Sequence, residues 1–273
     1  MRLGTESAAA LLLIASHCSA MRPSAAAERA YANYVVHVAM RLDRQHASPG
    51  SYLAIFNLAP PERTEAERHL LSGALRVEPV HGGTWTVDGA LMHHWRGEAF
   101  VPGATAKEML AVLRDYKHFR RYYAPEVVSA RVLAEHGRFA TVEIRFKKQM
   151  AIIIVLDAEC RVETAVTAST RGYSISRSTH IWQIDQPGTA HERRLTEEQE
   201  DGFLWHLNSY WSFIQWRNGL LMECEAVSLT RSVPRGLGWL IEPIIEDLPR
   251  TSLEFTLRAT ENALEGARKG ARQ

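Results

Sequence analysis

The stretch from Thr105 to Asn262 decides the fold of this 273-residue chain. It opens on TAKEMLAVLRDYKHFRRYY (105–123), which has the pattern of two short helices, and it ends on TSLEFTLRATEN (251–262), part of a second amphipathic helical region. Strand-like runs lie between them, such as TVEIRFK (141–147), in which apolar and polar residues alternate strictly. This order predicts a curved antiparallel sheet that grips a helix over an apolar hollow.

The limits of the helices are marked by caps. Thr105-Ala-Lys-Glu108 has the form of a capping box, and Thr251-Ser-Leu-Glu254 repeats that form after Pro249. Leu253, Leu257 and Leu264 then lie on similar helical faces. We therefore expect a long C-terminal helix with a bend at Pro249.

The strands follow from alternation and from turn residues. One strand is expected before the first helices, at Val87–Val101, and six after them. The six expected runs are Val128–Val132, Val142–Phe146, Ile152–Val162, Tyr173–Ile184, Phe203–Phe213 and Leu220–Leu229.

The part of the chain before these strands is predicted to be helical. Apolar residues recur at helical spacing from Tyr31 to Leu42, and Thr64-Glu-Ala-Glu67 has the form of another capping box. We expect a helical N-terminal extension over residues 28–86, a main domain over 87–266 and a tail over 267–273.

The first residues, 1–27, have the pattern of a secretory signal peptide. Arg2 precedes an apolar run from Ala8 to Ala15, and small residues suitable for cleavage follow around Ala20 and up to Ala27. The run is too short to span a bilayer. We expect export to the bacterial periplasm or to the medium, and Cys18 leaves lipidation open as an alternative.

Two further observations limit the chemistry of the chain. After cleavage at Ala20 only Cys160 and Cys224 would remain, and we expect both to be buried and free. Lys and Arg number 32 against 31 Asp and Glu, a formal net charge of +1, so the chain has no overall basic field and nucleic acid is not an expected partner. No transmembrane span is expected, transient membrane contact stays open, and nothing indicates the oligomeric state.

The sequence contains no recognisable motif for a metal, a phosphate or a catalytic nucleophile. His93 and His94 are adjacent on an expected strand and so point to opposite faces, which prevents a simple two-histidine chelate. No cofactor, metal or catalytic residue is therefore assigned.

An acid–base cluster remains an open alternative. His180, His206, Tyr210 and Glu223 could meet across neighbouring strands, but the sequence cannot place them within hydrogen-bonding reach.

Alternation also selects candidate ligand residues. Between Phe203 and Phe213 one face opposes His206, Asn208 and Tyr210 and is apolar, with Phe203, Trp205, Leu207, Trp211 and Phe213. Any one of these apolar side chains could simply fill a core, whereas the set, with its large aromatic rings and a Met, suits an irregular apolar ligand. The candidate ligand-binding residues are His180, Trp182, Trp205, Leu207, Trp211, Phe213, Met222, Cys224, Leu253 and Leu257.

The order of elements and the pattern Asp115-Tyr116-x-x-Phe119-x-x-Tyr122 resemble the START-like helix-grip superfamily (SRPBCC), which includes polyketide cyclases and coenzyme Q-binding proteins. The resemblance covers residues 88–265. Leu207-Asn-Ser-Tyr-Trp211 and the run from Leu229 to Trp239 are similar to those of exported bacterial members. The resemblance to this superfamily implies an α+β fold in which about seven antiparallel strands wrap around the C-terminal helix, with a tunnel between the sheet and the helix.

The expected function is binding or transport of a hydrophobic ligand, such as a lipid, a quinone or a polyketide-like molecule, without covalent catalysis. Two alternatives stay open. One is an enzyme of the polyketide cyclase or aromatase type that uses buried polar residues of the same cavity, and a compact cluster of His, Tyr and Glu at the cavity floor would favour it. The other is an envelope interaction protein whose N-terminal helices plug a vestigial pocket.

Overall fold

A computed structural model describes the backbone of residues 22–149, 153–232 and 238–270, and the side chains of these ranges except 238–246 and 269–270. Most of the expected signal peptide, residues 1–21, lies outside the described residues. The helical elements are α1 (Ala25–His46), η2 (Pro49–Ser51), η3 (Ala54–Asn57), α2 (Pro60–Leu71), α3 (Ala106–Arg114), η4 (Tyr116–His118), α4 (Phe119–Tyr122) and α5 (Gly238–Gly270). The strands are β1 (Arg76–Val87), β2 (Ala90–Pro102), β3 (Val127–His136), β4 (Phe139–Gln149), β5 (Ile153–Ala168), β6 (Arg171–Asp185), β7 (Arg193–Arg194), β8 (His206–Trp216) and β9 (Gly219–Arg231).

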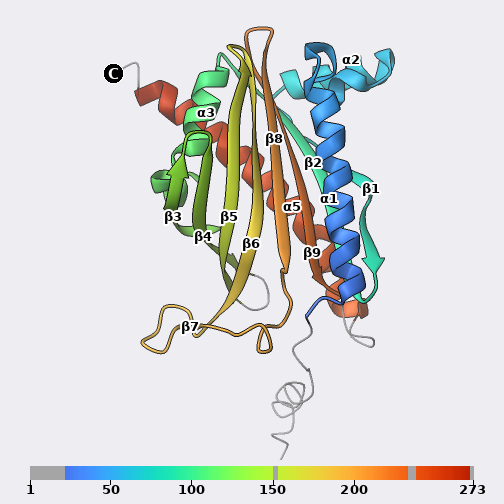
Figure 1. Cartoon of the computed structure of the whole chain (residues 1–273). Helices are drawn as coiled ribbons and strands as arrows, with labels where there is room; N and C mark the ends of the chain where they lie inside the picture. Colours follow the sequence, from blue (N-terminus) through green and yellow to red (C-terminus); the bar gives the residue numbers. More distant parts are fainter. Residues whose placement is uncertain (1–21, 150–152, 233–237, 271–273) are drawn as a thin grey trace, which may run out of the picture.

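The strands form one antiparallel sheet in the order β1-β2-β9-β8-β6-β5-β4-β3, and the two-residue β7 pairs with β6 beside this path (Figure 1). The six strands expected after the first helices are confirmed as β3, β4, β5, β6, β8 and β9. The α+β sheet is therefore the expected one, with one additional long strand at its β1 edge.

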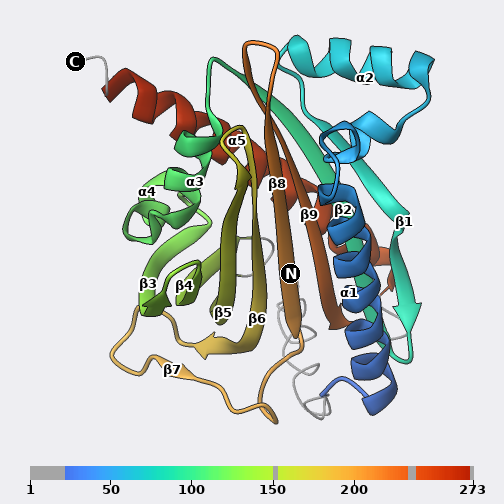
Figure 2. The same ribbon diagram turned by 45° about the horizontal axis from the view of Figure 1, so that its top comes forward.

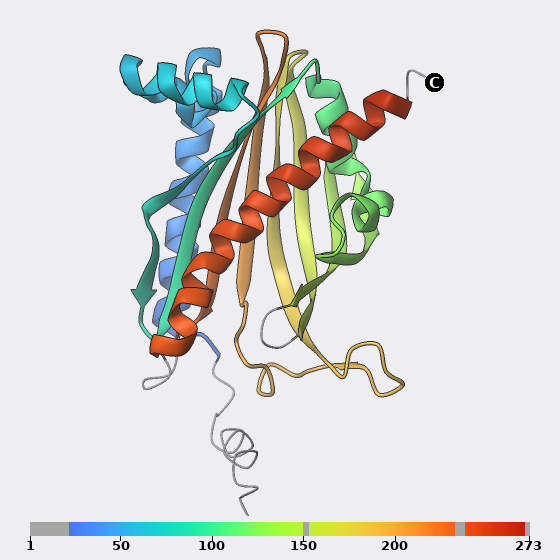
Figure 3. The ribbon, with the colours of Figure 1, turned by 180° about the vertical axis from the view of Figure 1, so that it is seen from behind.

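Helices cover the two faces of the sheet unequally. α5 crosses one face obliquely and α1 runs along the other (Figures 1 and 3). We call the face under α5 the inner face and the face under α1 the outer face. The Tyr31 hydroxyl of α1 donates a hydrogen bond to the Val227 carbonyl of β9 at the outer face.

One turn of α5 contacts both sides of the sheet: β2 near one edge, and the segment before β3 at the other edge. Leu257 lies against Gly97 of β2, so closely that a Cβ on Gly97 would lie 2.4 Å from the Leu257 Cδ1. The Thr260 hydroxyl is 3.1 Å from the hydroxyl of Tyr123, in the segment that leads into the edge strand β3. Since Leu257 and Thr260 are less than one turn apart, the sheet must bend around the helix (Figure 2). The expected helix-grip fold is confirmed.

Apolar side chains pack without a gap where α5 meets β2 and the upper part of β9. Leu220, Met222, Leu257 and Leu264 are fully buried there, and α3 covers the same cluster. The capping box that starts α3 is confirmed: the Thr105 side chain accepts from the Glu108 amide, and the Glu108 side chain accepts from the Thr105 amide.

The other two expected capping boxes are wrong. α2 begins at Pro60, whose fixed φ suits the first helical turn, and the Thr64 hydroxyl donates to the Pro60 carbonyl inside the helix. α5 continues through Pro249, and the Thr251 hydroxyl donates to the Asp247 carbonyl one turn back. In both cases the hydroxyl bonds within a helix that has already begun.

The helical extension expected over 28–86 ends at Leu71, because residues 76–87 form β1. Pro79 and the Gly82-Gly83 pair interrupt the alternation of this strand, and an edge position tolerates both. Asp88 and Gly89, both at positive φ, then form the two-residue turn into β2, so Val87 belongs to β1 and not to the expected strand Val87–Val101.

We expect Gly97→Ala to destabilise the protein by about 1–3 kcal/mol, because the added Cβ meets the side chain of Leu257, which is fully buried. Urea unfolding measures the change. The matched control is Gly266→Ala in α5, where a Cβ meets no atom within 4 Å. The control should raise stability by about 0.5–1 kcal/mol, and equal stability of Gly97→Ala and wild type would contradict the close approach.

Candidate ligand-binding cavity

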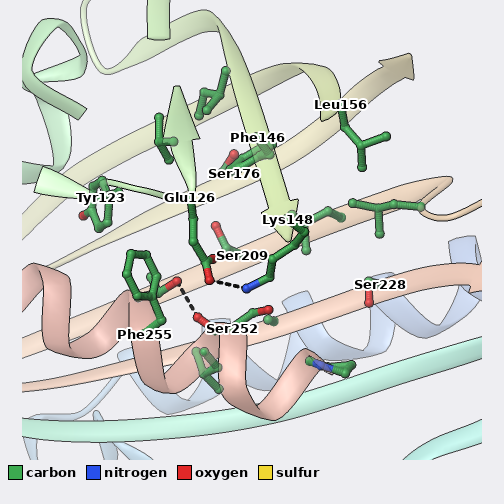
Figure 4. Close-up of a pocket in the computed structure, with 18 of the residues that line it drawn as sticks. Tyr123, Glu126, Phe146, Lys148, Leu156, Ser176, Ser209, Ser228, Ser252 and Phe255 are labelled. Carbon is green, nitrogen blue, oxygen red and sulfur yellow. Dashed lines mark hydrogen bonds and ion pairs between the residues drawn. The ribbon is translucent and has the colours of Figure 1, made fainter. Parts of the chain in front are cut away.

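A cavity of about 340 Å³ lies between the inner face of the sheet and α5 (Figure 4). Its walls are mostly apolar and come from three directions. The sheet contributes Val127, Ile144, Phe146, Ile154, Leu156, Val162, Leu207, Trp211, Cys224 and Ala226. The α3–α4 segment contributes Leu113, Tyr116, Phe119 and Tyr123, and α5 contributes Leu248, Pro249, Leu253 and Phe255.

Strand alternation places the floor of the cavity. Leu207, Ser209 and Trp211 of β8 project to the inner face because they are two residues apart. Across the β8–β9 pair, Ser209 is opposite Ala226 and Trp211 is opposite Cys224, so these β9 residues share the same face. The two strands form a continuous surface under α5.

Tyr123 fixes the wall opposite this floor. Its ring is buried, and burial raises the pKa of its phenol to about 12. Its hydroxyl bonds to Thr260, which ties the segment before β3 to α5. The phenol therefore stays neutral and acts as a spacer between the helix and the edge of the sheet.

One ion pair interrupts the apolar wall. Phe146 and Lys148 follow Ile144 on the inner side of β4, and Lys148 pairs with Glu126 (Figure 4). Each of the two side chains is 25% exposed. The opposite charges of Lys148 and Glu126 neutralise each other at the end of the cavity where β4 leads into β5.

Hydroxyl groups form the other polar part of the lining. Ser174 and Ser176 lie on β6, Ser209 on β8, and Ser228 on β9 (Figure 4 labels the last three). Ser176 pairs directly with Ser209 across β6 and β8. The floor is thus apolar with a short line of hydroxyls.

The expected ligand residues are divided between the cavity and its surroundings. Leu207, Trp211, Cys224 and Leu253 line it. The remaining inner-face candidates, Phe213, Met222 and Leu257, lie in the solid core beside it and are fully buried.

His180 and Trp182 were expected at the ligand, but both lie on the outer side of the sheet. Their rings stack on each other 4.1 Å apart, and the Arg194 guanidinium lies over Trp182. The cause is a β-bulge at Thr179, since Glu159 pairs with His180 while the next residue of β5 pairs with Ser178. One additional residue reverses the alternation of β6.

Trp205 also lies outside the cavity. It precedes β8, which begins at His206, so the alternation of that strand does not extend to it. Its ring packs against the cluster that α1 forms on the outer face.

Sequence reasoning missed the aromatic wall and the hydroxyls. Tyr116 and Phe119 belong to the Asp115–Tyr122 pattern, which identified the fold without assigning these rings to a site. Phe146 could have been found from its alternation with Val142 and Ile144. Ser209 could have been found in the same way, because it lies two residues from both Leu207 and Trp211.

The possible acid–base residues do not meet in the cavity. His206 bonds to Glu28 of α1, at 2.9 Å, and Tyr210 accepts a hydrogen bond from the Asn208 amide. Glu223 accepts from the Ala54 amide at 2.6 Å. All three side chains lie on the outer face, under α1 and the segment that follows it, and none is in the cavity lining.

Glu223 belongs to a buried cluster of charges that holds α1 on the sheet. Burial raises the pKa of Glu223 to about 8, and the carboxylates of Glu225 and Glu98 add to the rise. Burial would also raise the pKa of Glu225, but hydrogen bonding to His94 and the guanidinium groups of Arg96 and Arg41 hold it well below its usual value. Neighbouring carboxylates thus take opposite protonation states at neutral pH.

His93 and His94 point to opposite faces of β2, as expected. The His94 ring lies between Glu225 and the Tyr34 hydroxyl on the outer face. The His93 ring nitrogens lie 2.9 Å from the hydroxyls of Thr84 and Thr230, and burial lowers its pKa to about 4.

The two described cysteines are both free and buried, as expected. Burial raises the pKa of the Cys160 thiol to about 11 and that of Cys224 well above its usual value, so both stay protonated. Among the described helices, none combines the length and the hydrophobicity that a membrane-spanning segment requires.

We expect Glu223→Gln to change how stability depends on pH. Between the ordinary glutamate pKa of 4.5 and the folded value of about 8, the folded chain keeps a proton that the unfolded chain releases. This group therefore makes wild-type stability fall as pH rises through that window. Glutamine cannot titrate, so the stability difference between variant and wild type should grow up to about pH 8 and then level off.

Urea unfolding between about pH 6 and 9 measures this difference. The contrasting variant is Glu143→Gln on β4, whose lost ion pairs with Arg131 and Arg194 should cost up to about 1 kcal/mol, by the same amount at every pH in the window, because these pairs hold the pKa of Glu143 below its usual value. A constant difference for Glu223→Gln would show that Glu223 is ionised in the folded protein.

No family model and no curated protein sequence matches this chain. Three similar solved structures are an aromatase/cyclase from Streptomyces, a START superfamily protein from Mycobacterium smegmatis and a STAR-related lipid transfer protein from Xanthomonas axonopodis. They are 14%, 14% and 16% identical to the chain, with TM-scores of 0.46, 0.43 and 0.44. The matches cover 67%, 64% and 70% of this chain and 96%, 98% and 98% of theirs. The helix-grip fold itself follows from the chain's own strand order and from the position of α5 on the inner face.

Proposed function

We propose that this protein binds and carries a hydrophobic small molecule, of lipid, quinone or polyketide type, in the cavity between the sheet and α5, without covalent catalysis. The observation that carries the proposal is the cavity itself. Its volume of about 340 Å³ lies in the range of ligand sites, roughly 300–1,000 Å³. Its walls are leucine, isoleucine, phenylalanine and tryptophan side chains, which gain free energy when they contact an apolar ligand in place of water.

The position of the N-terminal helices supports a usable cavity. α1 lies on the outer face, and no residue of α1 or α2 is in the cavity lining. These helices therefore do not plug the site, which argues against the interaction protein with a vestigial pocket.

The kind of polar group in the cavity supports binding over acid–base chemistry. The described lining contains hydroxyls and the Glu126–Lys148 pair, while His206, Tyr210 and Glu223 face α1 on the other side of the sheet. Hydroxyl groups and a neutralised ion pair can orient a ligand through hydrogen bonds.

We also propose export to the periplasm or the medium, on the basis of the apolar run Ala8–Ala15. The start of α1 favours cleavage near Ala20 over cleavage at Ala27, because Ser24 caps the helix and Ala27 is fully buried. The mature protein should therefore begin between Ala20 and Ser24. Mass determination of the protein recovered from its own host tests this, and a chain that retains Met1 would contradict export by a cleaved signal.

We expect Ala226→Trp to weaken ligand uptake, because the indole would occupy the floor of the cavity. Titration with the uncharged fluorophore N-phenylnaphthylamine should give an affinity at least about tenfold weaker than that of wild type, since the lost contact area is apolar. The matched control is Ala134→Trp on β3, which is exposed and outside the lining, and it should bind like wild type.

Native mass spectrometry of wild type from its own host, followed by organic extraction, identifies the cargo. A stoichiometric apolar compound would establish binding. Failure of wild type to retain or take up any apolar molecule would refute the proposed function.

A further inference from the structure

We propose that the ligand carries uncharged oxygen atoms, as hydroxyl or carbonyl groups, and that Ser209 and Ser228 bind them. This inference rests on the proposed binding function and specifies the chemical class of the ligand. It favours ring or chain compounds that carry oxygen atoms over unsubstituted hydrocarbon chains.

The two serines are neighbours on the cavity floor. Ser209 of β8 is opposite Ala226 of β9, and Ser228 lies two residues further along β9, in the diagonal position. Diagonal neighbours on adjacent antiparallel strands are roughly 7–8 Å apart. Both residues line the cavity, and Figure 4 shows them on adjacent strands. One rigid ligand with oxygen atoms on one side can reach both.

Their hydroxyls lack partners within the described part of the protein, unlike those of Ser174 and Ser252. Ser174 bonds to the Thr164 hydroxyl at 3.1 Å, and Ser252 donates to a carbonyl of its own helix at 2.7 Å. No described atom makes a hydrogen bond to the hydroxyl of Ser209 or Ser228, although Ser228 is only 7% exposed. Both oxygens keep some accessible surface, and since these residues line the cavity, that surface faces it.

A hydroxyl that loses contact with water and gains no partner raises the free energy of the bound state. A ligand oxygen at the floor avoids this cost, whereas a hydrocarbon that covers the two hydroxyls imposes it. Sites built to hydrogen-bond a polar group discriminate strongly against an analogue that lacks it.

The oxygen should be uncharged because the floor offers no counter-ion. The charged residues of the described lining are Glu126, Lys147 and Lys148. Glu126 and Lys148 neutralise each other, and Lys147 lies on β4, which β6 and β5 separate from β8 in the sheet. An ionised group beside Ser209 and Ser228 would be buried without compensation.

The test compares naphthalene with 1,5-dihydroxynaphthalene, which share a skeleton and differ in two hydroxyls. Isothermal titration or quenching of tryptophan fluorescence gives both affinities for wild type, for Ser209→Ala/Ser228→Ala, and for the control Ser129→Ala, an exposed serine on β3 outside the lining. Thermal unfolding of each variant verifies that it is folded.

We expect the ratio of the two affinities, diol over naphthalene, to fall about tenfold in the double variant and to stay unchanged in Ser129→Ala, as the loss of two neutral hydrogen bonds predicts. Naphthalene itself should bind the double variant at least as tightly as wild type. An unchanged ratio in a folded double variant would overturn the serine assignment and leave the binding function intact. If neither compound binds wild type, the binding function fails and this inference fails with it.

Discussion

The close approach of α5 to β2 at Gly97 is the constraint on which the rest of the structure depends. Only a residue without a side chain lets Leu257 lie this near to the strand. The helix is thereby pressed against one side of the sheet, while the bond between Thr260 and Tyr123 draws the far edge toward it. The sheet bends, the side near β2 is filled by a buried apolar cluster, and the remaining space over β4, β5, β6, β8 and part of β9 becomes the cavity.

The sequence predicted those features that depend on local periodicity. Alternation in the run Phe203–Phe213 identified the inner face of β8 and with it Leu207 and Trp211, because each residue of β8 keeps its register with β9. The same rule failed for His180 and Trp182, where a bulge breaks the period, and for Trp205, which precedes the strand. Bulges depend on the pairing of distant segments, so a single strand read alone does not reveal them.

The outer face shows a different limit of sequence reasoning. Glu223 and Glu225 alternate with Met222 and Cys224, a pattern typical of one buried and one solvated face. Both glutamates are buried nevertheless, because α1 and the segment after it supply Arg41 and the Ala54 amide. A helix can thus cover the polar face of a sheet when it brings groups that pair with the buried charges. An apolar–polar pattern in the strand is the same whether that face is covered in this way or exposed to water.

The bulge at Thr179 gives the fold an unusual route to change. Substitutions alter a wall one side chain at a time, whereas closing this bulge would change the register of part of a strand. If Thr179 paired with Glu159 in a regular ladder, each later residue of β6 would shift by one position against β5 and turn to the other face. His180 and Trp182 would then enter the inner side and Ile181 would leave it. Loss of Thr179, by contrast, would leave His180 opposite Glu159 and keep every face as it is. A shift of register at this one position could therefore bring an aromatic ring and an imidazole to the inner face in place of an aliphatic side chain, while every other strand keeps its place.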